Sequence, residues 1–280
     1  MMDELTSRDF LRLSSFIQDY SGIKLPECRK TMVEGRLRRR ARALGLDSLG
    51  DYCRTLFEGD GLDLEAVGLI DAVTTNKTDF FREMAHFHFL ADEVLLRLAA
   101  DERQAGFGGR PLKVWSAACS NGAEPYSIAM VLDDFASAIR GFQYHVLATD
   151  ICSEVLHVAQ EAIYPLEMLD PVPAPMRQRY ILKSRDPRSR CFRIAPTLRT
   201  GVSFGRLNLM DEVLPVDSDF DIIFCRNILI YFDRETQRKV ASRLVGHLRK
   251  GGYFFLGHTE SVFNYSLPLR PVINSVFQKI

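Results

Sequence analysis

The chain has 280 residues, of which 46% are hydrophobic and 26% are charged, so it can bury one large core and a smaller second one. This composition excludes disordered, collagen-like and low-complexity proteins. Lys and Arg together number 36, as do Asp and Glu, and the resulting net charge of zero argues against a surface built to hold polyanions.

Neither export, nor membrane insertion, nor metal binding is indicated by the sequence pattern. The first nine residues include charged side chains in place of an apolar stretch, and no apolar run approaches the roughly 20 residues that cross a bilayer. The six cysteines are widely spaced without a C-x-x-C pair, which predicts reduced thiols and no zinc site. We therefore expect a cytoplasmic protein that does not insert into a membrane and holds no metal.

The first 75 residues are predicted to form a small all-helical domain. Apolar residues recur at three- and four-residue spacing after a cap at Thr6-Ser7, and Gly22 follows as a stop signal. A second helix is predicted over 27–44, and a third is predicted to start at Ser48.

The second predicted helix is strongly basic. Its stretch RKTMVEGRLRRRAR, residues 29–42, holds seven basic side chains and a single glutamate. The apolar residues Val33, Leu37 and Leu44 fall on one side of the helix, so the basic ones spread over the rest of its surface. These charges form either a solvated face or a docking site for an acidic partner.

From Pro111 onward, short apolar strands alternate with helical segments. Such alternation implies crossover connections and a mostly parallel sheet covered on both faces. The last apolar stretch, 272–278, has no helix before it, so we expect an antiparallel strand beside the previous one. The other predicted strands are 112–118, 144–149, 202–207, 220–224 and 253–256.

A proline-rich stretch, 164–200, interrupts this alternation. Two short strand-like runs, 179–182 and 191–194, flank a segment rich in charged and turn-forming residues, 183–190. This pattern predicts a β-hairpin inserted in the α/β domain.

The first predicted strand runs into the loop CSNGAEPY, residues 119–126, and a helix follows. At the carboxyl end of a strand in an open α/β sheet, small residues and free helix N–H groups can hold a nucleotide-like ligand. One glycine stands where the dinucleotide fingerprint needs three, which disfavours pyrophosphate binding. A tight turn without a ligand is the alternative.

Three further segments carry polar residues toward the same edge. Asp150 ends the second strand, where its carboxylate suits the hydroxyls of a ribose, although capping of the next helix would also explain it. The strand 220–224 is followed by Arg226, Asn227 and Tyr231, of which Tyr231 could instead pack against the next helix. The segment 74–83, TTNKTDFFRE, joins the two domains and contributes either ligand contacts or an ordinary linker.

Taken together, TTNKTDFFRE, WSAACSNGAEPYS, the ATD strand end, the pair Asn208-Leu209 and IIFCRNILIYFD resemble the CheR family of bacterial chemotaxis receptor methyltransferases. The resemblance covers nearly the whole chain. It implies an α/β fold: a doubly wound S-adenosylmethionine-dependent methyltransferase sheet, a small all-helical N-terminal domain and an inserted β-subdomain. The implied domains are a receptor-recognition domain at 1–75, a linker and helix contributing to the cofactor site at 76–110, and a methyltransferase domain at 111–280 with the insert at about 176–200.

The resemblance also implies the cofactor site, which takes S-adenosylmethionine and releases S-adenosylhomocysteine. Arg82 would lie near the carboxylate and the sulfonium of the cofactor, and Asp150 on its ribose. In the first loop the family usually reads STGEEPYS, whereas this chain has Asn121 and Ala123; Glu124 is retained, so we expect binding to survive. The implied cofactor-binding residues are Asn76, Thr78, Arg82, Glu124, Asp150, Asn208, Leu209, Arg226 and Asn227.

The implied activity is methyl transfer to glutamate side chains of chemoreceptor cytoplasmic domains, as part of sensory adaptation. A glutamate is already ionised at neutral pH, so its attack on a sulfonium methyl requires no general base. The enzyme must instead supply in-line positioning in a water-poor cleft. Arg82 and Tyr231 are the predicted catalytic residues, which orient the acceptor carboxylate.

Two receptor contacts follow from the resemblance. The acidic helical region of a chemoreceptor would bind the basic helix, and the inserted hairpin would either capture a receptor C-terminal peptide or merely brace the domain. We expect a monomer that works at receptor arrays. The residues expected to bind the receptor are Arg36, Arg38, Arg39 and Arg42, with Arg185, Arg188, Arg190 and Arg193 near the hairpin edge.

Two other functions stay open. A nucleic-acid methyltransferase would place the basic helix on phosphates, but such enzymes carry an Asn/Asp-Pro-Pro-aromatic tetrad where this chain has RNIL at 226–229, and the neutral net charge also disfavours nucleic acid. A non-catalytic scaffold would bind S-adenosylmethionine and a receptor without transferring a methyl group. Transfer of a labelled methyl group to receptors, with DNA and buffer as controls, separates the three.

Overall fold

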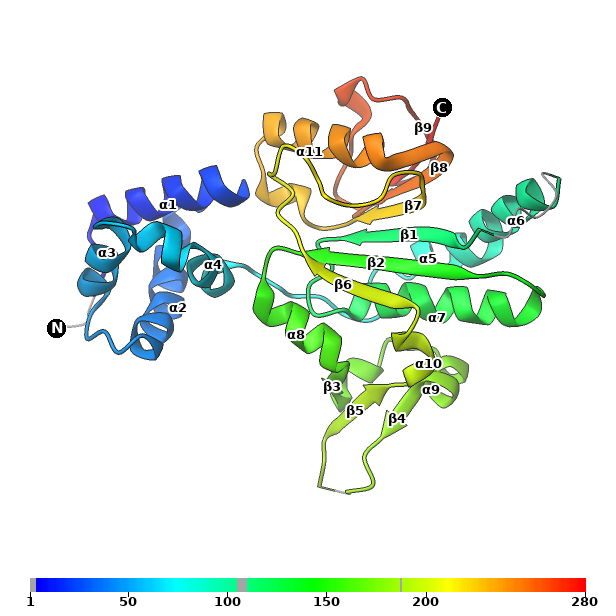
Figure 1. The fold of residues 1–280 in the computed structure, drawn as a ribbon, viewed down its shortest axis with the longest axis horizontal. Helices are drawn as coiled ribbons and strands as arrows, with labels where there is room; N and C mark the ends of the chain where they lie inside the picture. The colour runs from blue at the N-terminus through cyan, green and yellow to red at the C-terminus, as the bar shows by residue number, and fades with distance from the viewer. Residues whose placement is uncertain (1–3, 105–109, 187) are drawn as a thin grey trace.

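The computed structural model describes residues 4–104, 110–186 and 188–280. Residues 1–3, 105–109 and 187, which fall in the expected helical domain, linker and hairpin loop, lie outside the described residues. In the described part, a helical N-terminal domain stands beside a seven-stranded sheet, and a three-stranded sheet projects from the latter (Figure 1). None of the described helices is long and apolar enough to cross a membrane.

The N-terminal domain packs four α-helices around one apolar core. Thr6 caps the first helix by accepting from the backbone N–H of Asp9, and Gly22 ends it in the left-handed conformation, as predicted. Of the apolar residues expected on one side of the second helix, Val33 and Leu37 are buried, whereas Leu44 follows the end of the helix and is 44% exposed. The elements are α1 (Ser7–Ser21), the 3₁₀ helix η1 (Glu27–Arg29), α2 (Lys30–Ala43), α3 (Leu49–Phe57) and α4 (Gly61–Val73).

The large sheet has the strand order β6-β2-β1-β7-β8-β10-β9, in which the first five strands are parallel. Central β1 pairs with β2 on one side, Val114 opposite Val146, and with β7 on the other, Val114 opposite Ile222. The chain therefore reverses its direction of winding between β1 and β7, which is where open α/β sheets bind ligands. The parallel strands are β1 (Leu112–Ala117), β2 (Tyr144–Asp150), β6 (Val202–Arg206), β7 (Phe220–Cys225) and β8 (Leu248–Leu256).

Helices cover both faces of this sheet, and each face has its own buried apolar cluster. Below the sheet in Figure 1 lie α7 (Ala123–Ala138) and α8 (Ser153–Glu161), which pack against β2 and β6; above it, α11 (Arg234–His247) packs against β8. The segment after the interdomain linker forms α5 (Ala85–Phe89), a π-helical turn η2 (Leu90–Val94) and α6 (Leu95–Gln104).

The C-terminal segment is a hairpin in place of the single strand expected over 272–278. Strand β10 (Val276–Lys279) pairs antiparallel with β8, as predicted, but a turn at Asn274 and Ser275 separates it from β9 (Leu269–Ile273). The turn places Ser275 at a φ of 57°. The prediction rested on the apolar residues of the run, whereas Asn274 and Ser275 are of types that favour turns and mark the reversal.

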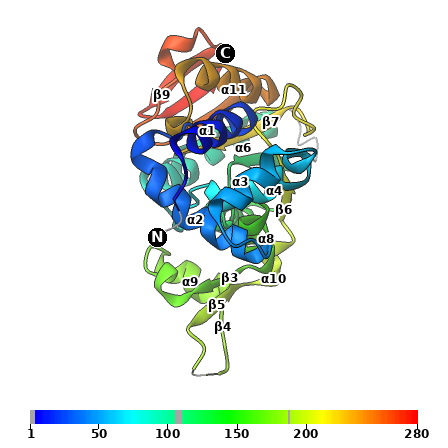
Figure 2. The ribbon, with the colours of Figure 1, turned by 90° about the vertical axis from the view of Figure 1, so that its left-hand side faces the viewer.

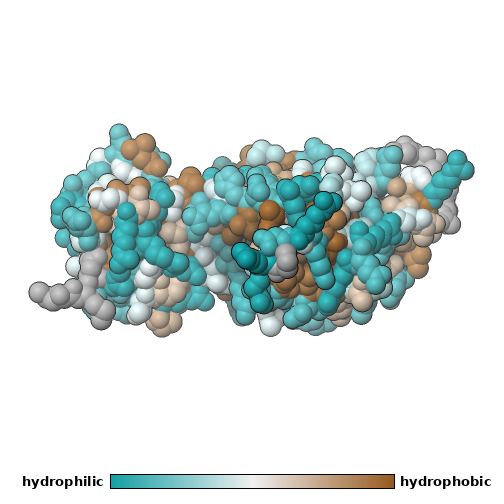
Figure 3. All heavy atoms as spheres, turned by 90° about the horizontal axis from the view of Figure 1, so that it is seen from below, coloured by the Kyte–Doolittle hydropathy of each residue, from teal (hydrophilic) through white to brown (hydrophobic). Residues whose placement is uncertain are grey.

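The insert contains the predicted hairpin of β4 (Ile181–Lys183) and β5 (Cys191–Ile194), and β3 (Ile163–Pro165) adds a third antiparallel strand. The prediction that a strand begins at 179 is wrong, since α9 (Ala174–Tyr180) extends to that point. The hairpin projects away from the sheet and carries hydrophilic side chains at its tip (Figures 1 and 3). The other short helices are η3 (Leu166–Leu169), α10 (Pro196–Arg199), η4 (Leu229–Tyr231) and η5 (Phe263–Tyr265).

Candidate active site

A cavity of about 280 Å³ lies at the carboxyl edge of the parallel strands, between the sheet and the helical domain. The helical domain stands directly in front of these strand ends (Figure 2). Every residue expected in the cofactor site and in catalysis lines this cavity: Asn76, Thr78, Arg82, Glu124, Asp150, Asn208, Leu209, Arg226, Asn227 and Tyr231.

The loop between β1 and α7 forms one wall of the cavity. Its sharp path includes Gly122 at a φ of 89°, where a Cβ atom would lie 2.8 Å from Ala159 Cβ and 2.9 Å from the Tyr164 hydroxyl. That hydroxyl donates to the carbonyl oxygen of Asn121 at 2.8 Å, and the Asn121 side chain accepts from the backbone N–H of Ala123 at 3.2 Å. Asn121 and Ala123, which depart from the usual family pattern, are therefore accommodated by the turn.

Asp150 lies at the end of β2 and is 7% exposed. Its Oδ2 accepts from the backbone N–H of Ser120 at 2.8 Å, and its Oδ1 accepts from that of Cys152, the first residue before α8, at 2.9 Å. Burial raises the pKa of this carboxyl, and the backbone N–H donors oppose the rise. The expectation that Asp150 caps the next helix is wrong, because Cys152 is the N-cap residue and α8 has no side-chain cap. The Asp150 side chain instead holds the turn before α8 and lines the cavity, where each oxygen has a second lone pair.

Arg226 forms a buried network with Glu83 and Glu124 beneath the cavity, here called the Arg226 network. The guanidinium is 6% exposed and donates to Glu124 Oε2 at 3.0 Å, to Glu83 Oε2 at 2.9 Å and to the carbonyl oxygen of Arg82 at 2.5 Å. Its Nε is buried and has no partner among the described residues. Two carboxylates thus compensate one buried cation, as burial of a charge requires.

Glu83 has the most strongly depressed carboxyl pKa of the site. Burial opposes its ionisation, but hydrogen bonds from Arg226 and Asn227 outweigh burial and lower the pKa to about 2. Glu124 differs: burial raises its pKa, although Arg226 and the Ser116 hydroxyl, which donates to Oε1 at 2.7 Å, act in the opposite direction. Sequence reasoning missed Glu83, although it closes the TTNKTDFFRE motif.

A second carboxylate that sequence reasoning missed, Glu260, holds the loop after β7. It accepts backbone N–H groups of Asn227 at 2.8 Å, Gly257 at 2.8 Å and Ile230 at 3.3 Å. A Cβ atom at Gly257 would lie 2.4 Å from Asn227 Nδ2, so only glycine fits there. These contacts fix Asn227, which has a φ of 59°, and with it the position of Arg226.

The interdomain linker, residues 74–83, forms the wall of the cavity opposite the loop between β1 and α7. Asn76 donates to Thr74 Oγ1 at 3.2 Å and to Cys152 Sγ at 3.4 Å, and its carbonyl oxygen accepts from the Ser120 hydroxyl at 2.9 Å. Arg82 is exposed and donates to the carbonyl oxygen of Lys77 at 3.2 Å. Unlike Arg226, Arg82 makes no ion pair with any other described residue, so its charge faces the cavity largely uncompensated.

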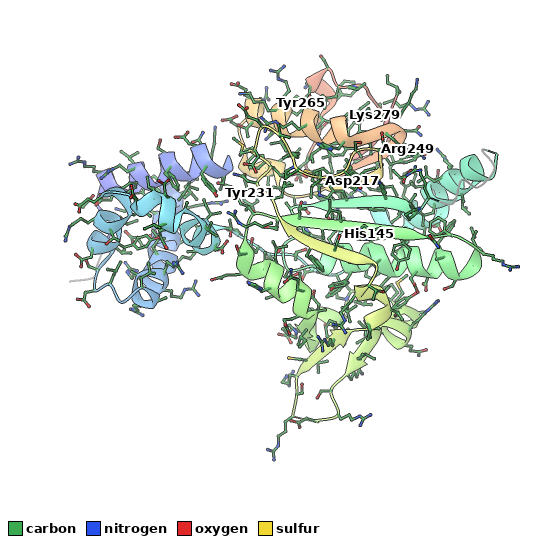
Figure 4. All side chains as sticks on the ribbon, viewed as in Figure 1. His145, Asp217, Tyr231, Arg249, Tyr265 and Lys279 are labelled. Atoms are coloured by element: carbon green, nitrogen blue, oxygen red, sulfur yellow. The ribbon has the colours of Figure 1, made fainter. Side chains whose placement is uncertain are left out.

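The helical domain closes the cavity. Asn208 Nδ2 donates to the carbonyl oxygen of Tyr20 at 2.6 Å, and the backbone N–H of Lys24 donates to the carbonyl oxygen of Tyr231 at 3.0 Å. Tyr231 lies at the junction of the two domains (Figure 4), and the Arg29 guanidinium is 5.6 Å from its ring centroid. Sequence reasoning missed the cavity residues of this domain, Ser21, Ile23, Leu25 and Arg29, because they reach the site only through domain packing.

The basic helix is not uniformly solvated. Arg36 departs from expectation: it is half-buried, and its Nη1 donates to the carbonyl oxygens of Val73 at 2.7 Å and Thr74 at 2.5 Å. Arg38 lies 3.5 Å from Glu34, whereas Arg39 and Arg42 are exposed. The four arginines therefore divide into one that holds the linker and three on or near the surface.

Comparison with known proteins gives matches over nearly the whole chain. The family described as CheR methyltransferase, all-alpha domain, matches residues 8–74, and CheR methyltransferase, SAM binding domain, matches residues 76–273. Chemotaxis protein methyltransferase 2 of Pseudomonas aeruginosa is 38% identical over 97% of this chain and 93% of its own length. The chemotaxis protein methyltransferases of Escherichia coli K12 and Borreliella burgdorferi are 39% and 36% identical over 92% of this chain, and 85% and 89% of their own lengths.

Proposed function

Because this chain belongs to the CheR methyltransferase family, we propose that it is a protein-glutamate O-methyltransferase that modifies chemoreceptors. It is an S-adenosylmethionine-dependent methyltransferase of chemotactic adaptation. One observation above all supports a carboxylate acceptor: of the two arginines Arg226 and Arg82 at the cavity, only Arg226 is neutralised by carboxylates of the described chain. Glu83 and Glu124 are paired with Arg226, while Arg82 is exposed at the cavity and has no carboxylate partner in the described part of the chain.

The cavity residues fit S-adenosylmethionine. Asp150 is a buried carboxylate with free acceptor capacity, as the two hydroxyls of a ribose require, and Ile151 and Leu209 add apolar surface suited to a base. Arg82 would lie near the cofactor carboxylate and the sulfonium, with Asn76 and Thr78 beside it, and its guanidinium has further N–H groups for the acceptor carboxylate. The cofactor supplies a methyl group that is already activated on a positively charged sulfur.

The protein needs no general base for this reaction. A glutamate acceptor is ionised near neutral pH, so the residues of the chain must position it and exclude water. Arg82 would orient the acceptor carboxylate by charge and Tyr231 by its hydroxyl, and both line the cavity. The helical domain limits solvent access through its contacts at Asn208 and Tyr231, which strengthens each electrostatic interaction inside.

Receptor recognition is assigned to α2. Arg39 and Arg42 are exposed and Arg38 lies close to the surface, so together they offer positive charge to an acidic receptor helix. Arg36 contributes differently, by connecting α2 to the linker that carries Asn76 and Thr78.

The inserted hairpin offers a second receptor contact. Strand β4 pairs with β5 on one side only among the described strands, and its Leu182 is 48% exposed. An open strand can accept a peptide as a further strand, and Arg185, Arg188 and Arg190 around it are exposed and would attract acidic side chains or a terminal carboxylate. Titration of receptor C-terminal peptides tests this contact: absence of saturable binding by every receptor tail from the same organism would leave α2 as the receptor site.

The deciding experiment for the acceptor follows a labelled methyl group. The chain is incubated with methyl-labelled S-adenosylmethionine and a receptor cytoplasmic fragment, with DNA and buffer as controls. Label that enters the receptor, is released by alkali as methanol and is lost when the modified glutamates are replaced by alanine supports the proposal. Alkali-stable label, or label on DNA, contradicts it, and binding of both ligands without transfer indicates a scaffold.

A further inference from the structure

Three side chains that can bind metals meet behind Arg226, outside the cavity described above. They are Glu83 of the linker turn, His86 of α5 and His258, which follows β8; we call them the His-Glu cluster. One ligand atom from each lies within 4.8 Å of the other two. Glu83 Oε2 is 3.5 Å from His86 Nδ1 and 4.0 Å from His258 Nε2. His86 and His258 line no part of the cavity.

The two ring nitrogens of His86 differ in their partners. Nε2 lies 3.0 Å from the Ser275 hydroxyl oxygen, which can accept from it while the hydroxyl donates to the carbonyl oxygen of Asn274 at 2.7 Å. In the tautomer with the proton on Nε2, Nδ1 presents a lone pair that can bind a metal ion. His86 is 1% exposed, and Nδ1 has no hydrogen-bond partner among the described residues.

In that tautomer the Nδ1 lone pair faces Glu83 Oε2 at 3.5 Å with no hydrogen between them. Two acceptors in this position repel each other, and a buried nitrogen without a partner is unfavourable. A cation between Nδ1 and Oε2 would satisfy both atoms. His258, which is 44% exposed, would give such a cation a third ligand and a path from solvent.

We propose that Glu83, His86 and His258 bind a divalent transition-metal ion such as Zn²⁺ or Co²⁺. Two imidazoles and one carboxylate are the donor set that such ions prefer, with bonds of about 2.0–2.2 Å. The three atoms have to approach one another by only about 1 Å to satisfy these lengths. The exposed side of His258 leaves a coordination position for water.

The ion would act on the cofactor site through a shared atom. Glu83 Oε2 also accepts from Arg226 Nη2 at 2.9 Å, and the same guanidinium holds Glu124 and the carbonyl oxygen of Arg82. A divalent cation on Oε2 withdraws charge from this hydrogen bond and repels the guanidinium. The bound ion is therefore an inhibitor of cofactor binding and takes no part in methyl transfer.

Metal binding is measured on the full chain after treatment with a chelator, in a Cys28→Ser background that removes an exposed thiol. Co²⁺ is followed by its visible absorption and Zn²⁺ by calorimetry. We expect one ion per chain, and a loss of affinity of at least about tenfold in His258→Ala. The matched control is His88→Ala, an exposed histidine of the same helix α5 that stands outside the cluster.

The link to the cavity is measured by S-adenosylhomocysteine binding with and without Zn²⁺, which does not depend on the identity of the methyl acceptor. Zn²⁺ should weaken this binding in the Cys28→Ser chain and in His88→Ala, and leave it unchanged in His258→Ala. Equal metal affinity in the two histidine variants would overturn the site, and metal binding without an effect on S-adenosylhomocysteine would overturn the inhibition. His258→Gln repeats the test with a side chain of similar size should His258→Ala fold poorly.

Discussion

Asn208 donates a hydrogen bond from its side-chain amide to the carbonyl oxygen of Tyr20 at 2.6 Å, joining the loop after β6 to the last turn of α1. The Oδ1 atom of the same amide accepts from the backbone N–H of Met210 at 3.0 Å, so the side chain is held from both ends. The cavity is thereby bounded by two domains that are far apart in sequence.

Asn208→Ala should weaken cofactor binding by loosening the helical domain. Loss of one hydrogen bond of this kind is worth about 1 kcal/mol, or roughly fivefold in the Kd of S-adenosylhomocysteine. Calorimetry measures the effect, with the exposed neighbour replaced in Asp211→Ala as control. Equal affinities in the two variants would show that the domain contact does not support the cofactor.

Asp150→Ala should weaken cofactor binding more strongly, by about 1.5 to 3 kcal/mol, because ribose hydroxyls lose a charged acceptor. The substitution also leaves the N–H groups of Ser120 and Cys152 without their partner, so thermal stability should fall as well. Calorimetry is therefore carried out well below the unfolding transition, with circular dichroism to verify folding. Unchanged affinity in the folded variant would remove Asp150 from the cofactor site.

Reversal of charge in Arg39→Glu/Arg42→Glu should cripple receptor methylation without a change in cofactor affinity. Both side chains are exposed on α2, away from the cavity lining. Wild-type methylation should fall with added salt, since charges are screened beyond about 8 to 10 Å at physiological ionic strength. Normal receptor methylation by the double variant would show that these basic side chains are solvated surface and do not bind the receptor.

Arg36→Ala should instead weaken cofactor binding more than receptor binding. Its guanidinium donates to the carbonyl oxygens of Val73 and Thr74, and its removal frees the linker that leads to Asn76. We expect a KM for S-adenosylmethionine several times higher and a KM for receptor that changes less. An effect confined to the receptor KM would show that Arg36 is a docking residue like Arg39.

Glu83 should make stability depend on pH in the acid range. Its folded pKa of about 2 lies below the ordinary value of 4.5, so its contribution is complete above about pH 5 and is lost as the pH falls toward 2. The difference amounts to about 3 kcal/mol. Buried Glu124 and Asp150 have raised pKa values and oppose this trend in both proteins.

Urea unfolding of wild type and Glu83→Gln at several pH values isolates the contribution of Glu83. The difference in free energy of unfolding between the two proteins should be largest near pH 7 and shrink below pH 4. A difference that stays constant down to pH 3 would show that Glu83 is not held ionised by Arg226 and Asn227.

Sequence reasoning located the cavity because carboxyl ends of parallel strands meet at one edge of a sheet. Asp150 and Arg226 could be assigned to that edge from strand positions, and the resemblance to a family added Asn76 and Arg82. Glu83 and Glu260 could not be found in this way. Their roles depend on contacts with Arg226 and Asn227 that cross long stretches of chain.

The sequence also did not predict several backbone turns near the site. Phe81, Glu83 and Asn227 all adopt positive φ although none is glycine, and these turns decide which groups reach Arg226. Hydrophobic periodicity carries no information about such turns. The docking of Ile23 and Leu25 at the cavity likewise follows from the packing of two domains.

The shared use of the helical domain bears on how many methyl groups the enzyme adds in one encounter. The domain that carries Arg39 on α2 also closes the cavity through Tyr20 and Lys24. A receptor held on α2 would therefore hinder the exchange of S-adenosylhomocysteine for a fresh cofactor. We expect distributive methylation, in which the enzyme dissociates after each transfer; early appearance of multiply methylated receptors in the presence of excess unmodified receptor would show that it is processive.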